Sequence, residues 1–209
     1  MDKILDMMMC LQNKSVWLGG AFLFFVFSFC GIGSRAIQAQ SKELEGFAKK
    51  ANAGSEIAFQ FSATDNKGKE IYNEAGKTLI QGNKYRLEVP GNLLIVNNGR
   101  TRWIYKEQDD ELVIAANNPN EEDILENPFA ILQSNGKQIR NYAVSIVKRA
   151  AGAGGVQMQG VPDKIILTAR GGAKYTIKIT GFKGVPNLSG PIFELDVKKY
   201  PKAVVTDLR

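Results

Sequence analysis

Histidine is absent from the 209 residues, and the only two cysteines are Cys10 and Cys30, close to the N-terminus. A chain without histidine lacks the commonest general base and the commonest metal ligand. If the N-terminal segment is removed, no thiol, disulfide or thiolate metal site remains. Most hydrolase mechanisms need a nucleophile activated by such a partner, so the sequence excludes them. We therefore expect no enzyme activity and no cofactor.

Three other signals of ligand chemistry are also missing. The net charge is +6, but basic and acidic residues are interspersed, so we expect no binding of nucleic acid. Residues 150–155, AAGAGG, lack the lysine and hydroxyl of a phosphate loop. The acidic runs 109–111 and 121–123 lie among turn residues, which is typical of solvated loops rather than of acid–base or calcium sites.

One long apolar run lies near the N-terminus. It is an uncharged stretch of 20 residues between Lys14 and Arg35, and the small residues that follow it offer a signal-peptidase site after Ala39. We interpret residues 1–39 as a cleaved export signal that precedes a single domain, residues 40–209. An uncleaved anchor is the alternative, because such a run is long enough to span a bilayer.

The rest of the chain is rich in strand patterns. Tyr85, Leu87 and Val89 alternate with charged residues, and Asn98-Gly99 favours a tight hairpin turn after the apolar run that follows them. Similar short runs recur at spacings of roughly 8–12 residues and predict about ten antiparallel strands. They include Val156–Gln159 and Ile192–Asp196, with residues 204–209 left as a tail.

Only two short helices are expected. One begins at Ser41, with Leu44, Phe47 and Ala48 on one face, and it ends before Gly54. The other covers Pro128–Ser134, where Asn127 precedes a proline at the first helical position. This second helix is so apolar that it must lie on an apolar surface. It is either an ordinary cover of the core or a lid over a pocket.

These patterns predict a mainly β (α+β) fold. We expect a curved antiparallel sheet that forms an incomplete, half β-barrel, with the short helices covering its concave apolar face. The candidate ligand-binding residues are the large apolar side chains expected on that face and on the second helix. Each could equally be part of the packed core. They are Phe59, Phe61, Tyr85, Leu87, Trp103, Tyr105, Leu112, Phe129, Leu132, Tyr175, Ile177 and Ile179.

Several short motifs resemble, in their order and spacing, those of the outer-membrane lipoprotein carrier family, the LolA-like proteins, in a Bacteroidetes-type version. The resemblance runs from about Ser41 to Arg209. One departure is that no arginine occurs in residues 80–83, where the family has the arginine that ties its lid helix to the barrel. The motifs are GNKYRLE at 82–88, NGRTRWIY at 98–105, NPF at 127–129, FELD at 193–196, KYP at 199–201 and VTDLR at 205–209.

The resemblance implies a periplasmic chaperone that shields the acyl chains of lipoproteins and shuttles them from the inner to the outer membrane. Its implied partners are acylated lipoproteins, an inner-membrane lipoprotein-releasing ABC transporter and an outer-membrane receptor. We expect a monomer. The alternative is a periplasmic lipid- or protein-binding module, for example a stress sensor, built on the same half-barrel.

The export signal leads to a first prediction. The mature protein should begin at Gln40, because the cut after Ala39 removes the whole apolar run. Amino-terminal sequencing of the exported protein measures this directly. Recovery of the intact chain in the membrane fraction would instead support the anchor.

Overall fold

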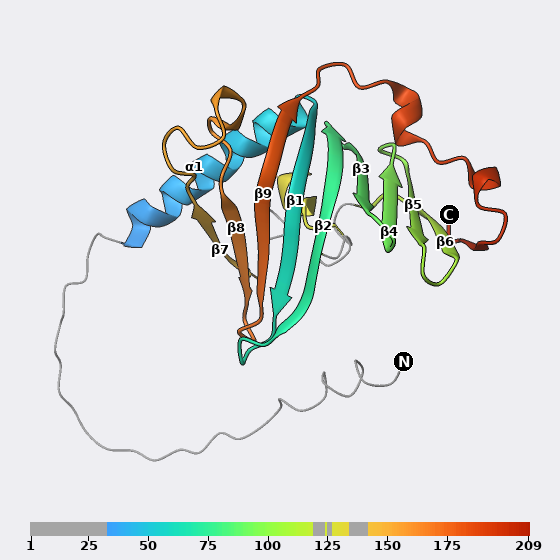
Figure 1. The fold of residues 1–209 in the computed structure, drawn as a ribbon, viewed down its shortest axis with the longest axis horizontal. Coiled ribbons are helices and arrows are strands. Elements are labelled where there is room, and N and C mark those ends of the chain that lie inside the picture. The colour runs from blue at the N-terminus through green and yellow to red at the C-terminus, as the bar shows by residue number, and fades with distance from the viewer. Residues whose placement is uncertain (1–32, 119–123, 125–126, 134–141) are drawn as a thin grey trace, which may run out of the picture. The chain divides into compact units, whose positions relative to one another are not determined.

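A computed structural model describes residues 33–118, 124, 127–133 and 142–209. In these ranges ten strands form one sheet in the order β10-β6-β5-β4-β3-β2-β1-β9-β8-β7 (Figure 1). The two end strands, β10 and β7, each have a single neighbour, so the sheet is open rather than closed into a barrel. The prediction of a mainly β fold built on an open sheet is confirmed.

The sheet consists largely of two groups of antiparallel strands. In the first group, β1 to β6, each strand pairs with the next one along the chain, and the same holds for the second group, β7 to β9. The two groups are joined where β1 pairs with β9. Alternate residues of every strand therefore point to the same face of the sheet. The strands are β1 (Ser55–Thr64), β2 (Glu70–Gln81), β3 (Lys84–Val89), β4 (Leu93–Asn97), β5 (Thr101–Lys106), β6 (Glu111–Ala116), β7 (Tyr142–Val147), β8 (Lys164–Ala169), β9 (Lys174–Gly184) and β10 (Val204–Asp207).

The first helix, α1 (Gly33–Asn52), crosses one face of the sheet and is 20 residues long. It begins eight residues before the predicted start at Ser41, so the prediction of a short helix is wrong here. The chain turns at Gly54, where φ is +114° and a side chain would meet the carbonyl of Val185. Residues 1–32, which hold most of the expected export signal, lie outside the described residues. The cut after Ala39 stays a prediction.

The second helix, α2 (Ala130–Gln133), is shorter than the predicted Pro128–Ser134. Asn127 acts as the expected cap, because its side-chain oxygen accepts a hydrogen bond of 3.0 Å from the amide of Phe129. A turn from Asn127 to Ala130 precedes the helix and takes up its first two predicted residues. Ser134 lies outside the described residues.

Two predicted strands, Val156–Gln159 and Ile192–Asp196, do not form, and 3-10 helices take up most of the first and the start of the second. Val156–Met158 forms η2, and Gly190–Phe193 forms η3, with Pro191 at its start. A proline cannot donate to a strand ladder, which weakens the strand expectation for this segment. Phe193 and Leu195 are still buried, because both side chains pack against the sheet.

The C-terminal tail is a strand that the sequence analysis did not predict. After a further 3-10 helix, η4 (Val197–Lys199), the chain reaches β10, which pairs in parallel with β6 from Val204–Glu111 to Asp207–Ile114. The expectation of a purely antiparallel sheet is therefore wrong at this edge. A long connection makes parallel pairing feasible, because it returns the chain to the same end of the sheet.

One close approach in the sheet supports a stability prediction. A side chain at Gly76 would place its Cβ 2.6 Å from the carbonyl oxygen of Glu88 and 2.8 Å from Cζ of Phe59. We expect Gly76→Ala to lower the free energy of unfolding by about 1–3 kcal/mol, measured by urea denaturation. Gly46→Ala is the control. Nothing lies within 4 Å of that position in α1, so alanine should stabilise by about 0.5–1 kcal/mol. Equal effects of the two changes would contradict the assigned packing.

Candidate functional site

The main apolar cluster lies between the sheet and its two α-helices. We call the face of the sheet that points toward α1 and α2 the covered face and the opposite face the outer face. Leu44, Phe47 and Ala51 of α1 and Leu132 of α2 are buried against the covered face. In β1 each second residue from Ser55 to Ala63 is buried, as expected for a strand with its apolar face under a helix.

The structure brings nine of the twelve candidate residues together in this main cluster. Phe129, next to α2, contacts Phe59 of β1 edge to face, with ring centroids 5.0 Å apart. Eight of the nine are buried, and Tyr175 is partly buried and packs against the others. The nine are Phe59, Phe61, Tyr85, Leu87, Phe129, Leu132, Tyr175, Ile177 and Ile179.

Trp103, Tyr105 and Leu112 do not share this face. They belong to a second cluster on the outer face, which the C-terminal segment covers through Leu195 and Tyr200. The rings of Tyr105 and Tyr200 lie 4.5 Å apart. Expecting these three residues on the inner face was wrong, because strands β4 to β6 carry apolar side chains on both faces and alternation alone cannot say which face is which.

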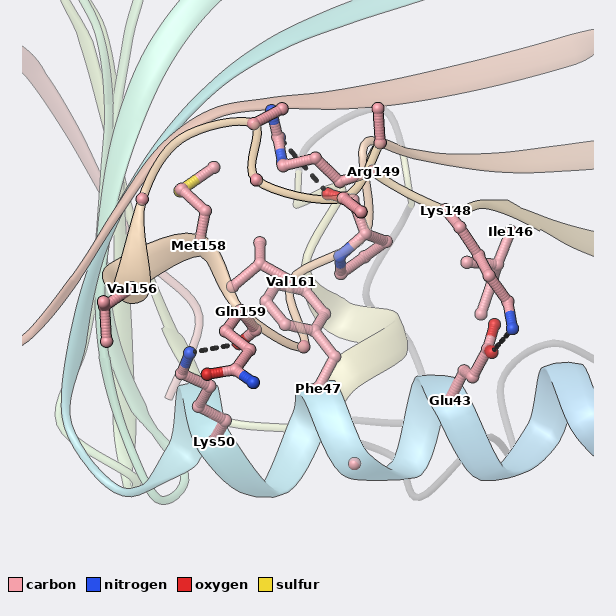
Figure 2. A pocket seen from close by; sticks show the side chains of 18 residues that line it. Glu43, Phe47, Lys50, Ile146, Lys148, Arg149, Val156, Met158, Gln159 and Val161 are labelled. Atoms are coloured by element: carbon pink, nitrogen blue, oxygen red, sulfur yellow. Dashed lines mark hydrogen bonds and ion pairs between the residues drawn. The ribbon is translucent and has the colours of Figure 1, made fainter.

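A pocket of about 870 Å³ opens between α1 and residues 149–162, beside the end of β7 (Figure 2). Its apolar lining includes Phe47, Ile146, Met158 and Val161, which also belong to the main cluster or pack against it. The pocket is therefore an opening onto the same apolar interior that the helices cover. None of the twelve candidate residues lines it.

Lys50 closes one side of the pocket by joining α1 to η2. Its ammonium group donates to the carbonyl oxygens of Gln157 and Gln159, at 3.1 Å and 2.7 Å. The same nitrogen lies 4.6 Å from the ring centre of Phe182, a cation–π distance. The Lys50 side chain thus holds the loop against the helix at one point.

The other side of the rim is formed by the residues that follow β7. Lys148 makes an ion pair with Glu43 of α1. Arg149 donates to the carbonyl oxygen of Ile179 in β9 at 2.5 Å, and its guanidinium lies 3.4 Å from the carboxylate of Asp163. These contacts fix both ends of the pocket rim to the sheet and the helix.

The pocket suits an amphiphile rather than a reacting substrate. Its floor is apolar, its rim carries Lys50, Lys148 and Arg149, and its one carboxylate, Glu43, is paired. Its volume is within the range of about 300–1,000 Å³ that small-molecule sites commonly have. Among the described residues no three acidic, cysteine or histidine side chains gather as a metal site would require.

Two tyrosines with raised pKa values lie outside the pocket. Burial, and then the nearby Glu74, raises the pKa of Tyr72, whose ring packs 5.6 Å from that of Phe61. A hydrogen bond to Asp110 raises the pKa of Tyr105. Both phenols are therefore neutral at physiological pH, and that of Tyr105 donates a hydrogen bond of 2.9 Å to the carboxylate of Asp110.

Sequence reasoning missed the pocket because its lining comes from segments that carry little chemistry. Residues 150–155 contain only alanine and glycine, and the sequence analysis considered them only as a phosphate loop, which they do not fit. The signal that was available is the position of this stretch directly after Lys148-Arg149 and before Met158. The small side chains of residues 150–155 leave a space that larger side chains would fill.

Comparisons with known proteins agree with the fold. No protein-family model and no curated protein matches the chain. A LolA superfamily protein from Nitrosomonas europaea has a similar structure, with a TM-score of 0.50 and 10% identity over 75% of this chain and 97% of that one. An uncharacterised conserved protein from Thermus thermophilus reaches a TM-score of 0.49 at 11% identity, over 81% of this chain and 99% of that one. The chain thus has a LolA-like half-barrel fold. Among the described residues, no helix is long and apolar enough to cross a membrane.

The Lys50 contacts provide a test of the pocket rim. We expect Lys50→Met to keep the packing on Phe182 but to lose both hydrogen bonds to the loop, lowering the free energy of unfolding by about 1 kcal/mol. Amide hydrogen exchange should quicken in residues 156–159. The matched control is Lys49→Met, which removes an exposed cation from the same helix. It should change neither the free energy of unfolding nor the amide exchange of residues 156–159. If both variants behave alike, Lys50 does not hold the loop.

Proposed function

We propose that this protein is a non-enzymatic periplasmic carrier that binds the acyl chains of lipoproteins between its sheet and its helices. It takes them from an inner-membrane lipoprotein-releasing ABC transporter and delivers them to the outer membrane, where a receptor accepts them. The observation that supports this best is the apolar covered face, closed by two helices and continuous with an open pocket.

The energetics favour this arrangement for an acyl ligand. Each methylene group removed from water contributes roughly 0.8 kcal/mol, so one long acyl chain gains on the order of 10 kcal/mol. A lipoprotein released into water would lose that contribution. An apolar cavity restores it without any catalytic group, and the rim cations can contact the polar end of the ligand.

The covering helices can move without breaking the sheet. The strand ladders do not run through α1 or α2, so lifting a helix leaves them intact, but the backbone carbonyl of Asn52 at the end of α1 accepts a hydrogen bond of 2.9 Å from the amide of Gly82. One side-chain bond joins the two helices, from the amide nitrogen of Asn52 to the carbonyl oxygen of Leu132 at 3.1 Å. Opening α2 therefore costs mainly apolar contact, which an acyl chain replaces, whereas lifting α1 also breaks the polar contacts of Lys50 and Glu43.

The proposal is tested on Phe129, which we assign to the moving cover. We expect Phe129→Ala to weaken retention of an acyl ligand or an apolar dye while lowering the free energy of unfolding by less than the roughly 3–5 kcal/mol typical of a packed interior. Urea unfolding and dye binding measure the two effects. Full destabilisation with unchanged dye affinity would rule out the cover assignment.

Two leucines supply a matched control for that experiment. Leu132 and Leu112 are both fully buried, but Leu132 belongs to the covering helix α2 and packs in the main cluster, whereas Leu112 lies in the second cluster. Leu132→Ala should weaken dye binding, whereas Leu112→Ala should lower stability alone. Mass spectrometry of natively purified protein should also find acyl species. A preparation without lipid that fails to release lipoproteins from spheroplasts would overturn the carrier function.

A further inference from the structure

Among the described residues, strand β7 ends the sheet on the side of the pocket and pairs with β8 alone (Figure 1). Its six residues, YAVSIV, include no charge, no proline and no glycine. Within the part of the chain that the structure describes, the backbone of residues 143–146 makes hydrogen bonds to no element except β8. One row of its amide and carbonyl groups therefore faces away from the sheet.

The opposite edge of the sheet differs from β7. Strand β10 is only four residues long, and it carries the charged Asp207. Short length and charge are two of the devices by which proteins protect sheet edges against pairing with other chains. Because β7 has none of these devices, its edge is suited to accept another strand.

The exposed edge leads directly to the pocket. Ile146 belongs to β7 and also lines the pocket, and Lys148 and Arg149, which follow the strand, lie on the rim. A ligand whose acyl chain fills the pocket and whose polar end contacts Lys148 or Arg149 has that end next to the C-terminal end of β7. Any polypeptide attached to that end starts next to the free edge.

We propose that the β7 edge binds, as an added antiparallel strand, the polypeptide that directly follows the acylated residue of a lipoprotein. This inference rests on the proposed function. The peptide starts at the pocket mouth beside Val147 and runs toward Tyr142, opposite to β7. About six residues match the length of the strand at roughly 3.4 Å per residue. Main-chain bonding makes this recognition tolerant of sequence, so one carrier can accept many lipoproteins.

Synthetic lipopeptides that share one acyl group test the inference. Affinity for the full-length mature protein should rise by about tenfold when the peptide is lengthened from two to eight residues, and it should level off near six. A strand bonds to its neighbour through alternate residues. N-methylation of one set of alternate peptide amides should therefore abolish the rise in affinity, and N-methylation of the other set should leave that rise unchanged. Equal loss in both registers would exclude strand addition.

Hydrogen exchange of the protein supplies the second readout. The eight-residue lipopeptide should slow exchange at alternate amides of residues 143–147, and the two-residue lipopeptide should not. Exchange of the β10 amides serves as the control and should not change.

If both lipopeptides bind equally and amide exchange in β7 is unaltered, the β7 inference fails and the carrier function stands. If neither binds, the carrier function itself fails. Protection of the β7 amides that face away from β8 before ligand is added, whether dependent on protein concentration or not, would assign the edge to a second copy or to another segment of this chain.

Discussion

The structure depends on one constraint, the need to cover the apolar face of a sheet that has no second sheet against it. Residues on the covered face of β1, β3, β8 and β9 are large and apolar, and they are almost fully buried. In a β-sandwich another sheet would meet them. Here α1 and α2 do so, and the position of both helices follows from that requirement.

The pocket forms where this cover is incomplete. α1 passes over the end of β7, but the loop that meets it there consists of alanine and glycine from 150 to 155. Such small side chains cannot fill the space between a helix and a sheet, and the side-chain bonds of Lys50 and Arg149 hold the loop without closing it. The cavity is therefore a consequence of side-chain volume in one segment rather than of the curvature of the sheet.

Strands β4 to β6 require cover on both faces, which explains the path of the C-terminus. Leu195 and Tyr200 pack on the outer face over Trp103 and Leu112, and β10 then pairs with β6. The segment after η3 thus completes the second cluster and one edge of the sheet together. It leaves the β7 edge as the side of the sheet next to the pocket.

The sequence by itself determined the strand content, the hairpins from residue 84 to residue 116 and nine of the twelve residues in the main cluster. These follow from alternation and turn residues, which are local properties of the chain. Only the tertiary structure decided which face of β5 and β6 the helices cover, where residues 204–207 pair and where the pocket opens. The physical reason is that alternation of apolar and polar residues along a strand shows only that its two faces differ. It does not show which helix or segment packs on each face. That choice depends on contacts between residues that are distant in sequence, such as Tyr105 with Tyr200 and Phe47 with Phe182.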